Sequence, residues 1–264
     1  MVKVEIKRLL KRPSFYIALL VGIAITALEA LTNNQIKLKP ENFSNFSSGV
    51  YSNFIQYSLG KYVRMLQMVF PLIVTIAFSD AYLEDVKSGF IKNIVTRYDK
   101  KKYLINRFLV NFVVSGLIIS IPLIVNYMIY AATIPSIEPQ VSYSSLALSS
   151  RDFLPYIYYE YPLLHVFIRI MLLFIYGGTF SSIALAISIF FRSKYVITII
   201  PFILYIGMDV MSSMIAHSVY DDYSPMLYLF SQSRYNHMFA LFPLIVVAAC
   251  FYVFLAGGMK NELN

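Results

Sequence analysis

The sequence SDAYLEDVKSGFIKNIVTRYDKKKYLINR, residues 79–107, is the longest strongly charged interval in a chain that is otherwise largely apolar. It contains two adjacent acids, Glu84 and Asp85, then Gly89, and then a basic series that ends at Arg107. Apolar runs lead into it and out of it, so we expect it to connect two membrane-spanning helices. A charged connection of this length is expected to face either a soluble partner or a lipid surface.

The composition places the whole chain in lipid rather than in water. Of 264 residues, 58% are hydrophobic and 14% are charged, whereas a soluble domain is roughly a quarter charged. No segment has the mixed composition of an independent soluble fold. The single cysteine, Cys250, lies in an apolar run, so it is expected to be a small buried side chain and not part of a disulfide framework.

Six apolar runs predict six spans, because each is close to the ~20 residues that cross a bilayer. The runs are continuously apolar and not alternating, which indicates helices instead of barrel strands. The predicted fold class is therefore an all-α integral membrane protein with one transmembrane domain over residues 1–264. We expect Pro71 to kink the second span and Pro122 to interrupt the third. The predicted spans are about 15–31, 62–78, 103–132, 163–191, 195–216 and 237–257.

Residues 2–12 precede the first span and have the pattern of an amphipathic helix. Their apolar residues recur at three- and four-residue spacing, and five basic residues occupy the other face, which is typical of a helix lying in the headgroup layer. The alternative, a cleaved signal peptide, is disfavoured because the basic region is long and helical in pattern and no convincing cleavage site follows. The apolar residues are Val2, Ile6, Leu9 and Leu10.

The basic residues predict the orientation. The amino terminus holds five Lys and Arg, residues 79–107 hold seven, the 192–194 turn holds two and the tail holds one, which makes fifteen of the 22 in the chain. The positive-inside rule therefore predicts a multi-pass protein of the cell (cytoplasmic) membrane with both termini and the 79–107 segment in the cytosol.

Three ionisable residues fall inside predicted spans, in the outer half of the membrane by this topology: Glu29, Arg169 and Asp209. Such residues are costly in lipid and so are candidates for function. One interpretation is that Arg169 pairs with Glu29 or Asp209, as part of a gate or a substrate path. The other is that Glu29 and Arg169 extend to the outer headgroups, which Asp209 is least able to do.

Small residues recur every fourth position along two predicted spans, which lets helices approach closely. Packing within the chain is the favoured interpretation, and a dimer seam or a flexible gate is the alternative. The two stripes are Ala18, Gly22, Thr26 and Ala30, and Gly178, Ser182 and Ala186.

Motifs for catalysis are missing from the sequence. It has no phosphate-binding loop of the form G-x-x-x-x-G-K-[ST] and no G-x-S-x-G or H-E-x-x-H motif, so we predict no enzymatic activity and no cofactor in this chain. His217 and Asp221 are four residues apart, but a zinc site needs further ligands in register, and no metal site is predicted.

The segment EDVKSGFIKNIVTRYDKKKYLINRFL, together with the basic amino-terminal helix and the six spans, resembles the permease subunits of type 2 ABC exporters. The resemblance covers nearly the whole chain. It is to the group that exports bacteriocins, antibiotics and cytolytic peptides such as phenol-soluble modulins. In that family the segment after the second span forms a coupling helix that docks on a separate ATPase. The matching residues are Glu84, Asp85, Gly89, Phe90, Ile91, Ile94, Val95 and Arg97, followed by Lys100 to Lys102.

The resemblance implies two permease copies, as a homodimer or a pair of related chains, and two ATPase subunits that bind ATP and Mg. It implies alternating access, with the coupling segment 79–102 as a lever and export of an amphipathic or hydrophobic substrate, for which antibiotic resistance or virulence is the expected role. It also implies that residues 217–237 dip back into the outer leaflet. Membrane lipids are further expected partners, and nucleic acid is not.

Other readings stay open. An ion channel or secondary transporter would show charges lining one path or inverted repeats, and an immunity permease would share the pattern without bulk export. A membrane enzyme would need a catalytic set at one depth. The basic residues of 79–107 alone would also fit an anionic lipid surface.

Overall fold

Six long apolar helices form the body of the protein. The computed structural model describes residues 2–37, 49–54, 60–96, 98–139, 152–215, 224–230 and 237–260, and the regular elements in these ranges are all helices. Six stretches are long and apolar enough to cross a membrane, the second of them running from α4 through the next helix to Lys87. The predicted all-α class with six spans is thus confirmed. The long helices are α2 (Pro13–Lys37), α4 (Lys61–Ile76), α7 (Lys100–Thr133), α9 (Pro162–Ile187), α10 (Lys194–Ile215) and α12 (His237–Lys260).

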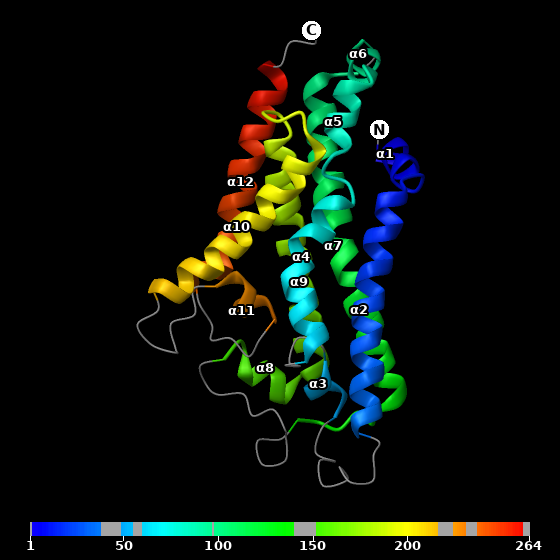
Figure 1. The fold of residues 1–264 in the computed structure, drawn as a ribbon, viewed down its shortest axis with the longest axis vertical. Helices are drawn as coiled ribbons and strands as arrows, with labels where there is room; N and C mark the ends of the chain where they lie inside the picture. The colour runs from blue at the N-terminus through cyan, green and yellow to red at the C-terminus, as the bar shows by residue number, and fades with distance from the viewer. Residues whose placement is uncertain are drawn as a thin grey trace.

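Short helices gather at the two ends of the bundle (Figure 1). Both chain termini lie at one end, as expected when the chain crosses an even number of times, and we call this the terminal end. The terminal end carries α1 (Val2–Leu9), α5 (Ala81–Lys87) and α6 (Phe90–Val95), and the opposite end carries α3 (Val50–Asn53), α8 (Pro155–Glu160) and α11 (Pro225–Phe230).

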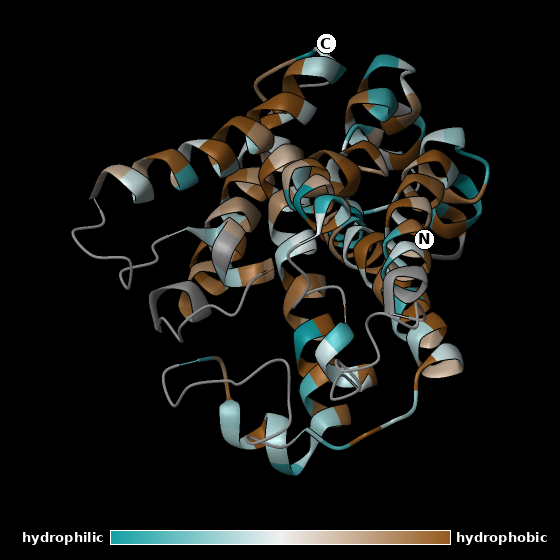
Figure 2. Cartoon of the chain, turned by 60° about the horizontal axis from the view of Figure 1, so that its bottom comes forward, coloured by the Kyte–Doolittle hydropathy of each residue, from teal (hydrophilic) through white to brown (hydrophobic). Residues whose placement is uncertain are grey.

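The long helices differ in how much of them is buried. We compared an apolar stretch of 18 residues from each of these helices. At least 61% of that stretch is buried in the α4–α5 stretch, α7 and α9, and at most 33% in α2, α10 and α12. The first three therefore form the centre of the bundle, and the other three flank it. Hydrophobic residues dominate the long helices even where they are exposed (Figure 2), as a lipid-facing surface requires.

Close helix packing accounts for both small-residue stripes. A methyl group on Gly22 would come 2.8 Å from the ring of Pro122 in α7, and one on Gly178 would come 2.5 Å from the ring of Phe112, also in α7. Ala18, Thr26 and Ala30 of the first stripe, and Ser182 and Ala186 of the second, are buried. The stripes thus serve packing within the chain, which is the interpretation that the sequence favoured.

Several boundaries differ from the sequence predictions, and the amino-terminal helix ends at Leu9 instead of residue 12. Pro122 does not interrupt the third span, because α7 continues through it from Lys100 to Thr133; helix interiors in membranes tolerate proline when neighbouring groups satisfy the freed carbonyl. The fourth span ends at Ile187, where Ser188 donates its backbone N–H to Ala184 and Leu185. Phe190 and Phe191, beyond this end, are 68% and 47% exposed.

Candidate functional site

The charged segment at the terminal end forms two short helices joined by a left-handed glycine. Gly89 has φ of 70° and separates α5 from α6. The backbone N–H groups of Ser88 and Gly89 close the end of α5 by donating to Glu84 and Val86. Glycine adopts this conformation at no steric cost. Gly89 therefore turns the chain from α5 into α6.

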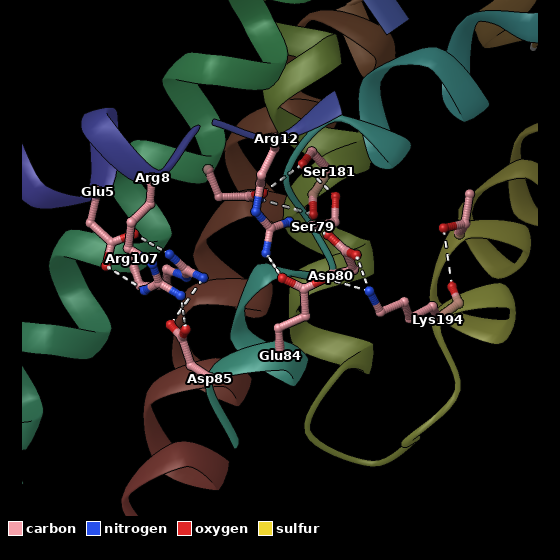
Figure 3. A network of polar contacts seen from close by, with 12 residues as sticks. Glu5, Arg8, Arg12, Ser79, Asp80, Glu84, Asp85, Arg107, Ser181 and Lys194 are labelled. Carbon is pink, nitrogen blue, oxygen red and sulfur yellow. Dashed lines mark hydrogen bonds and ion pairs between the residues drawn. The ribbon is translucent and has the colours of Figure 1, made fainter. Parts of the chain in front are cut away.

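Asp85 is the centre of a buried ion-pair group. It accepts hydrogen bonds from Arg8 of α1 and, at 2.6 Å, from the Tyr103 hydroxyl of α7. Arg107 of α7 lies 3.1 Å from the other side of this carboxylate and also pairs with Glu5 of α1. The side chains of Asp85, Arg107 and Glu5 are at most 3% exposed. We call these five residues the buried half of the charged cluster, although the Arg8 side chain is 30% exposed. Figure 3 labels four of them, Glu5, Arg8, Asp85 and Arg107.

A second group lies at the edge of the first. Arg12 pairs with Asp80 at 2.7 Å and with Glu84, and Lys194 at the start of α10 pairs with Glu84 and, at 3.2 Å, with Asp80. These four residues, the rim half, are 13% to 47% exposed in their side chains. The ring of Phe78 lies between the halves, with the guanidinium groups of Arg107 and Arg12 at 4.7 and 5.4 Å from its centre.

The charges of the cluster cancel. The acids Glu5, Asp80, Glu84 and Asp85 are matched by the bases Arg8, Arg12, Arg107 and Lys194. The pKa of Arg8 is raised above its ordinary value: burial acts to lower it, but the hydrogen bond to Asp85 and the attraction of Asp85 and Glu5 outweigh burial. The cluster therefore joins α1, α5, α7 and α10 through equal numbers of acidic and basic side chains.

The apolar residues predicted to dock a partner are used largely within the chain. Ile91 is only 4% exposed and packs in a cluster with Tyr82, Tyr103, Leu104, Phe108, Leu185 and Phe254, against which Ile94 is partly buried. The ring of Phe90 lies under the guanidinium of Arg8 at 4.4 Å. Arg97 lies outside the described residues. Among the side chains of this helix pair that the structure describes, the exposed ones are instead those of Val86, Lys87, Ser88 and Asn93.

A cluster of buried polar side chains, which we call the hydroxyl cluster, lies at the junction of α4 and α5. Ser79 lies 2.9 Å from the Ser181 hydroxyl, which also contacts Ser115 at 2.7 Å and Asn111 at 3.0 Å. All four side chains are buried. The hydroxyl cluster thus ties Ser79, at the junction of α4 and α5, to α7 and α9.

Glu29, one of the three predicted intramembrane ionisable residues, is buried between α2 and α7. Its carboxylate accepts hydrogen bonds from Asn126 at 3.0 Å, from the Tyr130 hydroxyl at 3.0 Å and from Asn33 at 3.2 Å. It is 2% exposed, so burial inside the bundle, and not extension to the headgroups, describes its position.

Arg169 and Asp209 lie in other surroundings at the opposite end. Arg169 is 1% exposed, donates to the Tyr228 carbonyl of α11 at 3.3 Å and lies over the ring of Phe153. Asp209 accepts from Ser224, the residue before α11. Ion pairs between described residues join none of Glu29, Arg169 and Asp209 to another, so the structure does not bring these three together.

Of the predicted outer segment 217–237, the structure describes residues 224–230 and His237. Tyr228, Leu229 and Phe230 of α11 are buried in the main apolar core, and Gln67 of α4 donates to the Phe230 carbonyl at 3.2 Å. His217 and Asp221 lie outside the described residues. Within the described ranges, no group of three or more His, Cys, Asp or Glu residues could hold a metal ion.

Sequence reasoning missed most of the charged cluster. The sequence identifies Glu84 and Asp85 as candidate site residues. It uses their basic partners on α1, α7 and α10 only to predict the orientation in the membrane. One local signal was present: Glu5 is the only acid in a helix that is otherwise basic and apolar.

Comparison with protein-family models, with curated proteins and with solved structures finds no match to this chain.

Proposed function

We propose that this chain is the transmembrane subunit of an ATP-driven exporter of the type 2 ABC class, with α5 and α6 as the element that receives force from a separate ATPase. The observation that supports the proposal most is the charged cluster. It fixes the base of α5 to α1, α7 and α10, while the tip of the helix pair stays exposed.

A coupling element has to be exposed where a partner binds and rigid where it joins the membrane helices. Val86 at 40% exposure, Lys87, Ser88 and Asn93 supply the first property. The ion pairs and the buried packing of Ile91 supply the second, because a displacement of α5 displaces the helices that share its charges. In this proposal the terminal end is cytosolic and the membrane is the cell membrane, as the positive-inside rule predicts.

The rest of the proposed assembly is two such chains with two ATPase subunits that bind ATP and Mg, and the cargo is an amphipathic or hydrophobic substrate such as a peptide. The flanking helix α10 leans away from the bundle toward the opposite end (Figure 1). It exposes Ile203, Met211 and Met214 at 59%, 60% and 80%. An apolar face of this kind suits lipid, a second copy or an apolar cargo.

The test is capture of the ATPase subunit by the purified chain, with a charge reversal on the exposed tip. Lys87→Glu is expected to abolish or strongly weaken co-purification of the ATPase and the stimulation of its activity. Lys260→Glu is the matched control, because Lys260 is also exposed at the terminal end but lies on α12, outside the predicted coupling segment 79–102. Undiminished capture by Lys87→Glu, or equal loss in both variants, would contradict the assignment of α5 and α6.

A further inference from the structure

Helix α1 and the turn after it have an outward face that takes no part in the charged cluster. Glu5 and Leu9 are buried against the bundle, whereas Val4, Ile6 and Leu10 are 51%, 45% and 51% exposed. Lys7 and Lys11 are exposed among these apolar side chains. The prediction of an apolar face opposite a basic face is therefore wrong in detail, because Arg8 turns inward and part of the apolar surface turns outward beside lysines.

The two lysines have no counter-charge in the described part of the chain. The acids nearest to α1 are already matched by Arg8, Arg12, Arg107 and Lys194, and none of the ion pairs between described residues includes Lys7 or Lys11. Lys7 lies in the last turn of α1, and Lys11 lies in the turn that follows the helix, where its backbone N–H donates to the Arg8 carbonyl at 3.2 Å. Both lysines line one cavity, so their ammonium groups can reach the same anion.

A shallow cavity of about 280 Å³ lies on this face, lined by Val4, Lys7, Arg8 and Lys11. Sites that enclose drug-sized molecules are about 300–1,000 Å³, so this cavity suits a small anionic group whose remainder lies outside. Arg8 is committed to Asp85 and to the face of Phe90. Lys7 and Lys11 are therefore the cationic groups of this cavity that remain to contact a bound anion.

We propose that this face of α1 binds an anionic phospholipid, with the headgroup phosphate between Lys7 and Lys11 and the acyl chains against Val4, Ile6 and Leu10. Charge complementarity calls for an anion, and the apolar side chains interleaved with the lysines call for hydrocarbon beside it. An acidic protein or a nucleic acid would satisfy the lysines alone. The span α2 begins at Pro13, just after this face, which places α1 where a chain enters the membrane. The inference does not depend on the proposed exporter function.

The experiment is native mass spectrometry of the full chain in detergent, titrated with phosphatidylglycerol and, separately, with phosphatidylcholine of the same acyl chains. We expect preferential binding of phosphatidylglycerol. The variant Lys7→Gln/Lys11→Gln should weaken that binding roughly 5-fold per lysine, or about 30-fold in all, at the usual contribution of a basic residue near an anionic lipid surface. The control is Lys101→Gln/Lys102→Gln, which removes the same charge from exposed lysines of α7 at the same end.

Retained phosphatidylglycerol preference in the control together with its loss in the α1 variant would support the site. Equal affinity for the two lipids would overturn it, and so would an equal loss in both variants, which would indicate diffuse surface charge. Unchanged lipid binding in the α1 variant with lost ATPase capture would also overturn it and assign the lysines to a protein interface. Both variants keep the charged cluster, and an unchanged melting temperature confirms that each is folded.

Discussion

The two halves of the charged cluster contain the same chemistry at different depths. In the buried half, Asp85 and Arg107 are at most 1% exposed, whereas in the rim half Glu84 and Lys194 are 38% and 47% exposed. Removing one partner of a buried pair leaves an uncompensated charge and costs about 3–5 kcal/mol, while an exposed pair contributes about 0–1 kcal/mol. Burial, and not the number of ion pairs, therefore decides which half holds the helices together.

This difference assigns separate tasks to the halves. The buried half fixes α1 and α7 to α5, and its loss is expected to destabilise the fold. The rim half connects α5 with α10 through contacts that water can replace, so it can rearrange without unfolding. The chain has no Trp, so we suggest following unfolding with a thiol-reactive dye at the partly buried Cys250.

The largest expected effect is that of Arg107→Ala. The substitution leaves Glu5 and Asp85 buried without their shared cation, and we expect a loss of about 3–5 kcal/mol in the free energy of unfolding. Thermal unfolding in detergent measures it. Lys194→Ala in the rim, where the lysine side chain is 47% exposed, is the control and should cost at most about 1 kcal/mol. Similar losses in the two variants would show that the halves are not energetically distinct.

A smaller loss is expected for Tyr103→Phe. The Tyr103 hydroxyl donates to Asp85 at 2.6 Å and is buried, and a hydrogen bond to a charged group contributes about 1.5–3 kcal/mol. The same melting assay, compared with Tyr98→Phe at an exposed tyrosine, checks this. A change no larger than that of the control would mean that Asp85 is held by its arginines alone.

The smallest effect is expected for Glu84→Gln. This change removes the charge that pairs with Arg12 and Lys194 at the rim, and we expect a loss of at most about 1 kcal/mol that fades as salt is added. Melting temperatures at low and high ionic strength measure it. A loss that equals that of Arg107→Ala, or one that salt does not reduce, would contradict the separation of the halves.

Much of the architecture was predictable because hydrophobic length is a local property. The helical class and the six helices long and apolar enough to cross a membrane follow from runs of apolar residues. The exact ends were less predictable: the apolar run around Phe190 and Phe191 continues past the end of α9, since composition does not report where backbone hydrogen bonds stop.

The candidate site was predictable only in part. Asp85 was identified from its place before Gly89, but its burial between Arg8 and Arg107 depends on helices that are 77 and 22 residues away in the chain. Ile91 was expected to face a partner and instead packs inside the chain. Alternation of polar and apolar residues cannot distinguish a surface that meets another protein from one that meets another helix of the same chain.

The sequence by itself determined that six helices are long and apolar enough to cross a membrane and that a charged segment follows the second of them, because the transfer of apolar residues into lipid depends only on composition and length. Only the tertiary structure decided which charges neutralise one another. Ion pairing requires proximity within a few ångströms, and α1, α5, α7 and α10 reach that proximity only after the bundle has assembled.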